Sequence, residues 1–169
     1  DGTFVVPLDG GKARRIGGDE IPLDTFQPAW SPDGKRIAFC STTPGWTQIG
    51  LYHLDDEHIE WLTGDEGEHL NPAWSQDGKH LCWIRVLSET ASVEIHTFGE
   101  REPRRRIETG NGFCHLPLFT MDNSSIVFIR EDPRRPPDLW LVSLEDGQLT
   151  QLTDSLPSSL RSAKFVIPE

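Results

Sequence analysis

Short apolar runs alternate with turn-forming residues, and this alternation repeats about every 45 residues. The segment 28–34, PAWSPDG, returns as PAWSQDG at 72–78 and, in degraded form, as PLFTMDN at 117–123. The prolines that lead these segments are 44 and 45 residues apart. An apolar run follows each segment, at 36–39, 80–83 and 125–128. Because separate features share one period, the sequence contains a true internal repeat.

Each repeat unit contains four short runs rich in β-branched and aromatic residues, separated by Gly, Pro, Asp or Asn. Such runs predict β-strands, and the pairs Asp33-Gly34 and Asp77-Gly78 predict tight hairpin turns. No long stretch keeps a helical period. Four-stranded units of this length are typical of β-propeller blades. We therefore predict an all-β propeller with three full four-stranded blades and partial-blade strands at both ends, as a segment of a larger propeller.

The repeat also sets the expected boundaries. A partial blade with a third and a fourth strand comes first, and the first strand of a further blade comes last. Because open blade edges expose unpaired backbone groups, they favour a homo-oligomer or a longer parent chain. The expected units are 1–26, 27–70, 71–115, 116–160 and 161–169.

The segment 28–39, PAWSPDGKRIAF, resembles the repeat of the TolB-like propellers of bacteria. It is also similar to the propeller repeats of prolyl oligopeptidase-family serine peptidases and of oligogalacturonate lyases. The third unit departs from this pattern, since it has Thr120-Met121-Asp122-Asn123 in place of Ser-Pro-Asp-Gly. The resemblance implies the fold, whereas the function remains open because these families share blades and differ in chemistry.

Charge narrows the classes of partner. Lys and Arg number 16 against 27 Asp and Glu, which gives a formal net charge of −11. This charge argues against nucleic acid and against docking on an anionic membrane, and no apolar run is long enough for a membrane-spanning helix. A protein or peptide is the expected partner. Cys40, Cys82 and Cys114 form no CxxC pair, so we expect buried thiols, which slightly favour the cytoplasm; a true TolB relative would be periplasmic.

Strand order predicts which residues face a partner. In antiparallel blades the loops that enter each new blade share one face with the loops between the second and third strands. We expect long, irregular loops on this face, at 41–47, 86–92 and 131–138, and such loops commonly carry function. The candidate binding residues form an inner ring around a central channel and an outer ring beyond it: Gln27, His69, Asn71, His115 and Arg161 in the first, Trp46, Arg134 and Arg135 in the second.

The same two histidines, His69 and His115, are also weak candidates for metal ligands. The metal assignment is weak because they do not occupy matching positions in their repeat units, and we expect no cofactor. The tryptophans within strands should pack between blades. They are Trp30, Trp74, Trp83 and Trp140.

Two basic clusters, 101–106 and 130–137, are predicted to lie in solvated turns on opposite faces.

The sequence contains no G-x-S-x-G, H-E-x-x-H, P-loop or Rossmann glycine pattern. Its acidic residues are abundant but are predicted to lie in turns away from the channel mouth. The leading hypothesis is therefore a non-catalytic TolB-like binding module that recognises a protein or peptide on the inter-blade loop face. The alternatives are the propeller of a prolyl oligopeptidase-family peptidase, gating its substrate, and a lyase-like metal enzyme.

Overall fold

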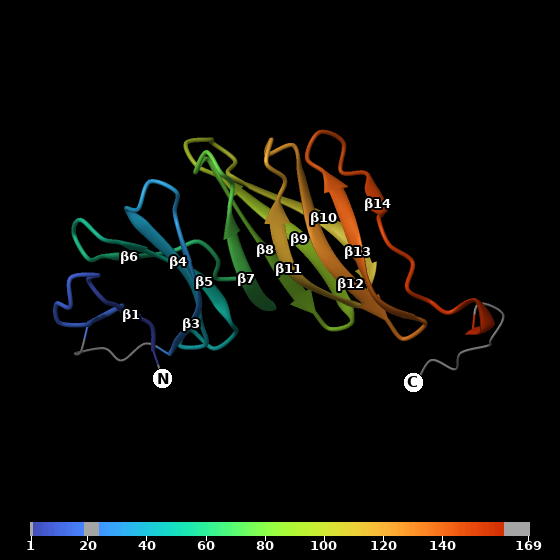
Figure 1. Ribbon diagram of the computed structural model, residues 1–169. Coiled ribbons are helices and arrows are strands. Elements are labelled where there is room, and N and C mark those ends of the chain that lie inside the picture. Colours follow the sequence, from blue (N-terminus) through green and yellow to red (C-terminus); the bar gives the residue numbers. More distant parts are fainter. Residues whose placement is uncertain (1, 19–23, 161–169) are drawn as a thin grey trace.

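The computed structural model describes residues 2–18 and 24–160, and the described chain is built from strands and one short 3-10 turn, Ser158–Leu160. Three four-stranded antiparallel sheets follow one another along the chain, preceded by a two-stranded sheet (Figure 1). In each large sheet the strands pair in sequence order. This arrangement confirms the prediction of three four-stranded blades with partial strands beside them. In the described residues no helix is long and apolar enough to cross a bilayer.

The two-stranded sheet contains β1 (Phe4–Val5) and β2 (Arg14–Arg15). The first blade contains β3 (Thr25–Trp30), β4 (Arg36–Ser41), β5 (Gln48–His53) and β6 (Ile59–Trp61). The second contains β7 (Glu68–Trp74), β8 (His80–Leu87), β9 (Thr90–Thr97) and β10 (Arg104–Asn111). The third contains β11 (Phe113–Phe119), β12 (Ser125–Asp132), β13 (Arg135–Ser143) and β14 (Leu149–Gln151). The strand predicted over 161–169 lies outside the described residues.

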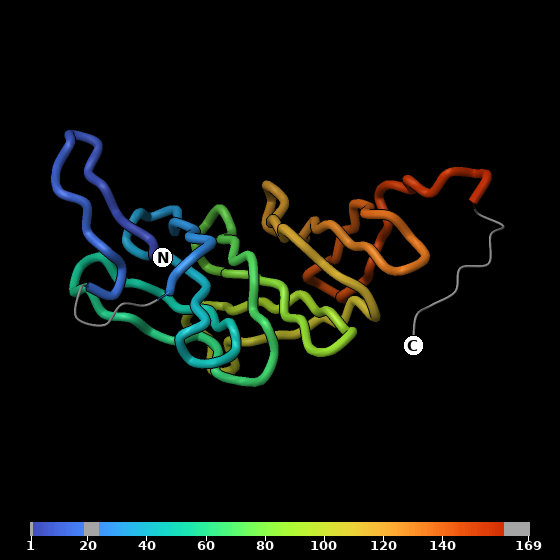
Figure 2. The backbone as a smooth tube through the Cα atoms, turned by 90° about the horizontal axis from the view of Figure 1, so that it is seen from below, coloured from blue at the N-terminus to red at the C-terminus, as the bar shows by residue number. Residues whose placement is uncertain are grey.

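The blades stand side by side, with the first strand of each next to the first strand of its neighbour. Strand β3 contacts β7, and β7 contacts β11. Both views show the same order of sheets from the N-terminal hairpin to the C-terminal end (Figures 1 and 2). The first strands therefore form one continuous inner wall.

The turn between the first two strands is built alike in all three blades. The Ser31 hydroxyl donates to the carboxylate of Asp33, and Thr120 does the same to Asp122 in the third blade. Gly34 has a φ of +70°, and Asn123 reaches +58° at the matching position. Since asparagine tolerates this left-handed conformation, the degraded third copy retains the same turn.

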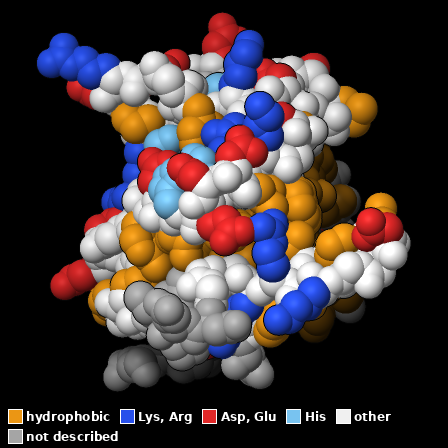
Figure 3. All heavy atoms as spheres, turned by 90° about the vertical axis from the view of Figure 1, so that its left-hand side faces the viewer, with side chains coloured by type: hydrophobic (Ala, Val, Ile, Leu, Met, Phe, Trp, Pro, Cys, Tyr) orange, Lys and Arg blue, Asp and Glu red, His pale blue; other side chains and the backbone are white. Residues whose placement is uncertain are grey.

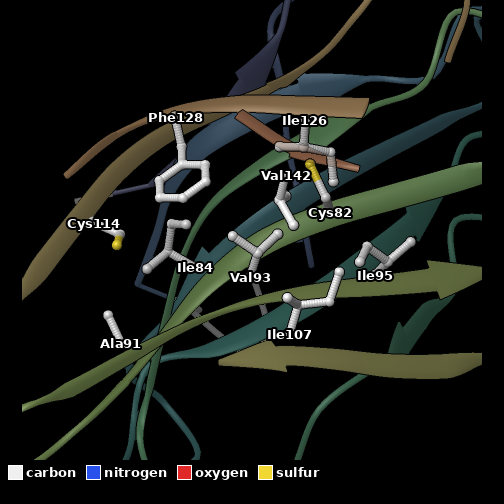
Figure 4. Packing of buried hydrophobic residues seen from close by; sticks show 10 residues of the cluster. All are labelled: Cys82, Ile84, Ala91, Val93, Ile95, Ile107, Cys114, Ile126, Phe128 and Val142. Carbon is white, nitrogen blue, oxygen red and sulfur yellow. The ribbon is translucent and has the colours of Figure 1, made fainter. Parts of the chain in front are cut away.

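The core lies between the sheets, which explains why the second strands are apolar on both faces. In β8 every residue from Leu81 to Ile84 is fully buried. One apolar cluster joins the second and third blades and includes Ile84, Val93 and Phe128 (Figure 4). Similar clusters join the first blade to the second and to the β1–β2 hairpin. Cys40, Cys82 and Cys114 are buried free thiols.

The tryptophans of β3 and β7 occupy matching positions but differ in burial. Trp74 stacks on Phe98 with ring centroids 5.2 Å apart, and the Arg36 guanidinium of the first blade lies 4.7 Å from its ring. Its indole N–H donates to the carbonyl of Ala29 at 3.0 Å. Trp30 is 53% exposed, so the expectation that it packs between blades is wrong. The described chain before it forms only the small β1–β2 sheet, which gives it no matching wall.

Hydrophobic side chains are also exposed at the N-terminal end of the row of blades. Figure 3 views the molecule from the end that carries β1 and β6, and shows hydrophobic side chains between charged and histidine side chains. Phe4 and Val6 of the N-terminal segment and Trp61 of β6 are among the exposed apolar residues.

This difference gives a matched pair of substitutions. We expect Trp74→Ala to lower the free energy of unfolding by about 3 kcal/mol, the low end of the usual cost of Trp→Ala in a core, because the side chain is only partly buried. Trp30→Ala should cost less than about 1 kcal/mol, as at other exposed positions. Urea denaturation of both variants measures the two values. Equal losses would contradict the inter-blade packing described above.

Candidate functional site

The loops on the predicted recognition face are shorter than expected. Among the three connections between a second and a third strand, Thr42–Thr47, between β4 and β5, is the extended one. Ser88–Glu89 alone joins β8 to β9, and Pro133–Arg134 alone joins β12 to β13. The expectation of long irregular loops over 86–92 and 131–138 is therefore wrong, because the flanking strands continue almost to the turn.

The outer candidates on this face are exposed. Trp46 is 46% exposed in the Thr42–Thr47 connection. Arg134 is exposed at its turn, and Arg135 donates to the side-chain oxygen of Gln151 at 3.2 Å. Beside these arginines lies a groove of about 290 Å³. Its lining combines the turn with the segment after β14: Asp132, Pro133, Arg134, Arg135, Pro136, Leu156, Pro157 and Leu160.

The inner candidates Gln27 and Asn71 tie the blades together. Each lies at a bulge of its first strand and has a positive φ, 49° and 57°. The side-chain oxygen of Gln27 accepts from the Asn71 backbone N–H at 2.8 Å, and that of Asn71 accepts from Leu116 N–H at 3.5 Å. Leu116 occupies the matching bulge of the third blade. These oxygens serve the inter-blade contact, beside a groove of about 300 Å³ formed by the three bulges.

The two candidate histidines lie on different faces of their blades. His69 aligns with Arg85 of β8 and is fully buried. His115 aligns with Ile129, the counterpart of the Leu70 position, and its ring lies 3.4 Å from Glu131. Because adjacent strand positions point to opposite faces, the register separates the two rings. Within 2–18 and 24–160 no group of three or more His, Cys, Asp or Glu side chains is placed to hold a metal ion. Arg161 lies outside the described residues.

A charged network between the first two blades was missed by the sequence analysis. Arg104 donates to Glu94 at 2.8 Å and to both carboxylate oxygens of Asp65 at 2.8 and 3.1 Å. Arg106 donates to Glu94 at 2.6 Å and to Asp65 at 3.4 Å. Glu94 is 0% exposed. The prediction of a turn over 101–106 is wrong for 104–106, which lie in β10. There Arg104 and the exposed Arg106 neutralise these carboxylates.

The position of Glu94 is unusual within the repeat. Its neighbours across the sheet are Trp83 and Arg106. The matching rows in the first and third blades are Phe39–Gly50–Trp61 and Phe128–Trp140–Gln151. Aligning the third strands of the three units would have revealed an acid where the other blades carry glycine and tryptophan. The charge is specific to the second blade.

His69 is the buried centre of this network. The indole N–H of Trp83 donates to its Nδ1 at 3.0 Å, and since indole only donates, the neutral ring carries its proton on Nε2. That Nε2 makes no hydrogen bond with any described residue and lies 3.6 Å from Asp65. Burial lowers the pKa of His69 to about 4, despite the nearby carboxylates. Burial alone would raise the pKa of Asp65, but hydrogen bonds and charge from Arg104 outweigh it and hold that pKa at about 2.

Acid should therefore destabilise the fold through His69. In the unfolded chain a histidine binds a proton below about pH 6.5, whereas folded His69 binds one only near pH 4. The unfolded state thus binds more protons between these values, and the free energy of unfolding should rise with pH across this window. His69→Asn keeps an acceptor for Trp83 and removes the titration. Urea denaturation at a series of pH values should show a reduced slope in this variant, and an unchanged slope would contradict the assignment.

No protein-family model matches the chain. Among curated proteins, a Tricorn protease homolog of Streptomyces coelicolor is 33% identical over 63 residues, and a TolB homolog of Protochlamydia amoebophila is 45% identical over 40 residues. These matches cover 37% and 24% of this chain but only 6% and 8% of the two relatives. The chain thus corresponds to a small part of each relative.

Solved structures match nearly the whole chain. TolB from Acinetobacter baumannii superposes with a TM-score of 0.70 and 22% identity, over 90% of this chain and 37% of the TolB chain. An oligogalacturonate lyase in complex with manganese gives a TM-score of 0.68 at 19% identity, over 88% of this chain and 41% of the lyase. A prolyl endopeptidase gives 0.62 at 14% identity, over 86% and 25%. All three families whose repeats the sequence resembles are structural neighbours, which confirms the resemblance, and the chain has a TolB-like β-propeller fold.

Proposed function

We propose that this TolB-like propeller segment is a non-catalytic binding module that recognises a protein or peptide on the inter-blade loop face. The observation that supports it most directly is the exposure of aromatic and arginine side chains on that face. Trp46 and Arg134 are exposed, and such side chains are the commonest anchors of protein interfaces. Both lie in connections between the second and third strands of their blades, and loops carried on a sheet scaffold commonly bind partners.

The groove beside Arg134 indicates what kind of peptide could bind on this face. Its lining combines the guanidinium groups of Arg134 and Arg135 with apolar side chains of the turn and of the segment after β14. Asp132, which also lines it, already accepts the Arg134 backbone N–H at 2.8 Å. A peptide segment with an acidic residue next to an apolar residue fits this lining. The half-exposed His115 lies on the inner side of the same blade and could extend the contact toward the channel.

The test begins with selection of binders from a random peptide library on the folded chain. Trp46→Ala combined with Arg134→Ala should weaken a selected peptide by at least about tenfold. The matched control is Asp55→Asn combined with Glu145→Gln, since both residues are exposed in turns on the opposite face. If only the control pair weakens binding, recognition does not occur on the inter-blade loop face.

A second candidate function is favoured by the similarity to the Tricorn protease homolog. In this case the chain would be the propeller of a larger peptidase and would gate or orient its peptides. A catalytic segment in the same reading frame, with hydrolysis of the peptides that bind the loop face, would support this function. The structural similarity to an oligogalacturonate lyase does not support the lyase-like alternative, because similarity at 19% sequence identity shows the fold alone.

A further inference from the structure

The carboxylate of Asp65 lies where N–H groups from four side chains converge. Both terminal nitrogens of Arg104 bind it, and Arg106 reaches it at 3.4 Å. The Nε atoms of Arg85 and His69, one on a guanidinium and one on an imidazole, lie 3.4 and 3.6 Å from this carboxylate without forming a hydrogen bond to it. This is the donor arrangement that recognises a carboxylate in proteins.

Asp65 does not satisfy all of these donors. Arg85 Nε and His69 Nε2 are buried and form no hydrogen bond within the described part of the chain. The other carboxylate of the network, Glu94, already receives Arg104, Arg106 and the indole of Trp83. Buried donors without acceptors cost free energy, so an oxygen placed closer to them than Asp65 reaches would bind favourably.

The local charge points to the same ligand. Three guanidinium groups face two carboxylates, while His69 is neutral near pH 7 because burial lowers its pKa to about 4. The network is therefore locally cationic in a chain with a formal net charge of −11. A partly buried guanidinium cluster with one excess charge favours a further anion.

The Asp65 side chain is the movable part of the network. It is 39% exposed, and Arg106 is 38% exposed, so solvent reaches both. The backbone of the connection between β6 and β7 is held in place, since Gln48 donates to the Asp65 carbonyl at 2.9 Å and Arg85 to the Glu66 carbonyl at 2.7 Å. The side chain can therefore leave its arginines without unfolding the loop.

We propose that Arg85, Arg104, Arg106 and His69 form a carboxylate-binding site, which Asp65 occupies in the free protein and which the carboxylate of an acidic peptide takes by displacing it. The ligand carboxylate receives the paired N–H groups of Arg104 and the two donors that Asp65 leaves unsatisfied. The inference rests on the proposed function, because the β6–β7 connection opens on the inter-blade loop face. It adds the chemical group that is recognised and an internal competitor for it.

Formate is the direct probe, because it is the group that Asp65→Ala removes. Formate should raise the melting temperature of Asp65→Ala more than chloride does at equal ionic strength, whereas the wild-type chain should respond equally to both salts. Glu66→Ala is the matched control: it removes the same charge from the same connection, and the side chain is exposed. It should behave like the wild type. An equal response of Asp65→Ala to both salts overturns the proposal.

Peptides then identify the source of the carboxylate. Triglycine with a free C-terminus, its C-terminal amide, and an acetylated and amidated Gly-Glu-Gly are titrated by calorimetry. At least one carboxylate-bearing peptide should bind Asp65→Ala at least about tenfold more tightly than it binds the wild type, and a further Arg106→Gln change should abolish the gain. The free-acid and Gly-Glu-Gly peptides distinguish a chain terminus from an acidic side chain. If the amide binds as tightly as both, the site does not read a carboxylate.

Two further results distinguish a failure of the carboxylate site from a folding defect and from a failure of the proposed function. If Asp65→Ala fails to fold in chloride, recovery of its native circular dichroism spectrum in formate supports the site, and equal failure in both salts overturns it. Trp46→Ala with Arg134→Ala tests the proposed function and leaves the contacts of Asp65 intact. Loss of peptide binding in that pair, together with no effect of Asp65→Ala, overturns the carboxylate site alone.

Discussion

Replacing Glu94 with alanine is expected to lower the free energy of unfolding by about 3 to 5 kcal/mol, the usual cost of leaving a buried ion-pair partner uncompensated. Glu94 has no solvent exposure, and its oxygens receive Arg104 at 2.8 Å and Arg106 at 2.6 Å. Its removal leaves three guanidinium groups, those of Arg85, Arg104 and Arg106, against one remaining carboxylate, that of Asp65. The indole N–H of Trp83 also loses one of its two acceptors.

A pair of further variants isolates the charge. Glu94→Gln keeps an acceptor for Trp83 and removes only the negative charge, so its loss should be most of that of the alanine variant. Glu108→Ala changes an exposed glutamate in the same β10 neighbourhood and should cost less than about 0.5 kcal/mol. Chemical denaturation of the three variants gives the values. A Glu94 variant as stable as Glu108→Ala would show that the network contributes nothing to the fold.

The repeat itself could be predicted from the sequence because it depends on interactions between residues that are close together in the chain. The Ser-Pro-Asp-Gly turn needs a hydroxyl, a carboxylate and a residue with positive φ at fixed spacing, and these are readable even where Thr120 and Asn123 replace Ser and Gly. Continuous apolar runs such as Leu81–Ile84 likewise follow from burial on both faces. Each of these features depends on residues close together in the chain.

The charged network could not be predicted in the same way, because its members meet only across strands and blades. Asp65, in the connection between the first and second blades, is 39 residues from Arg104 of β10. An arginine-rich segment next to a proline has the composition of a solvated turn, and only the register with β9 places Arg104 and Arg106 over Glu94. The charge balance of −11 gave no sign of a local cationic cluster.

The exposure of two outer candidate residues agrees with the strand order, but the environment of the inner candidates could not be predicted. Strand order placed Trp46 and Arg134 on an exposed face, as the structure has them. It could not foresee that His69 would be buried by Trp83, or that the oxygen of Gln27 would bind the next blade. Burial and hydrogen-bond partners depend on how neighbouring blades pack, which a single strand does not encode.

Trp83 belongs to the apolar cluster between the first two blades and also donates to His69 and Glu94 of the charged network. Its removal should have the largest effect of any single substitution considered. Trp83→Ala is expected to cost about 4 to 5 kcal/mol, because removal of a fully buried indole leaves a cavity and His69 and Glu94 each lose the hydrogen bond from its N–H. Trp83→Phe keeps most of the volume and removes the N–H, so it should cost about 1 to 3 kcal/mol. The exposed Trp46→Ala is the control and should cost less than about 1 kcal/mol. Urea denaturation that gives equal losses for Trp83→Ala and Trp83→Phe would mean that the hydrogen bonds, and not the packing, account for this side chain.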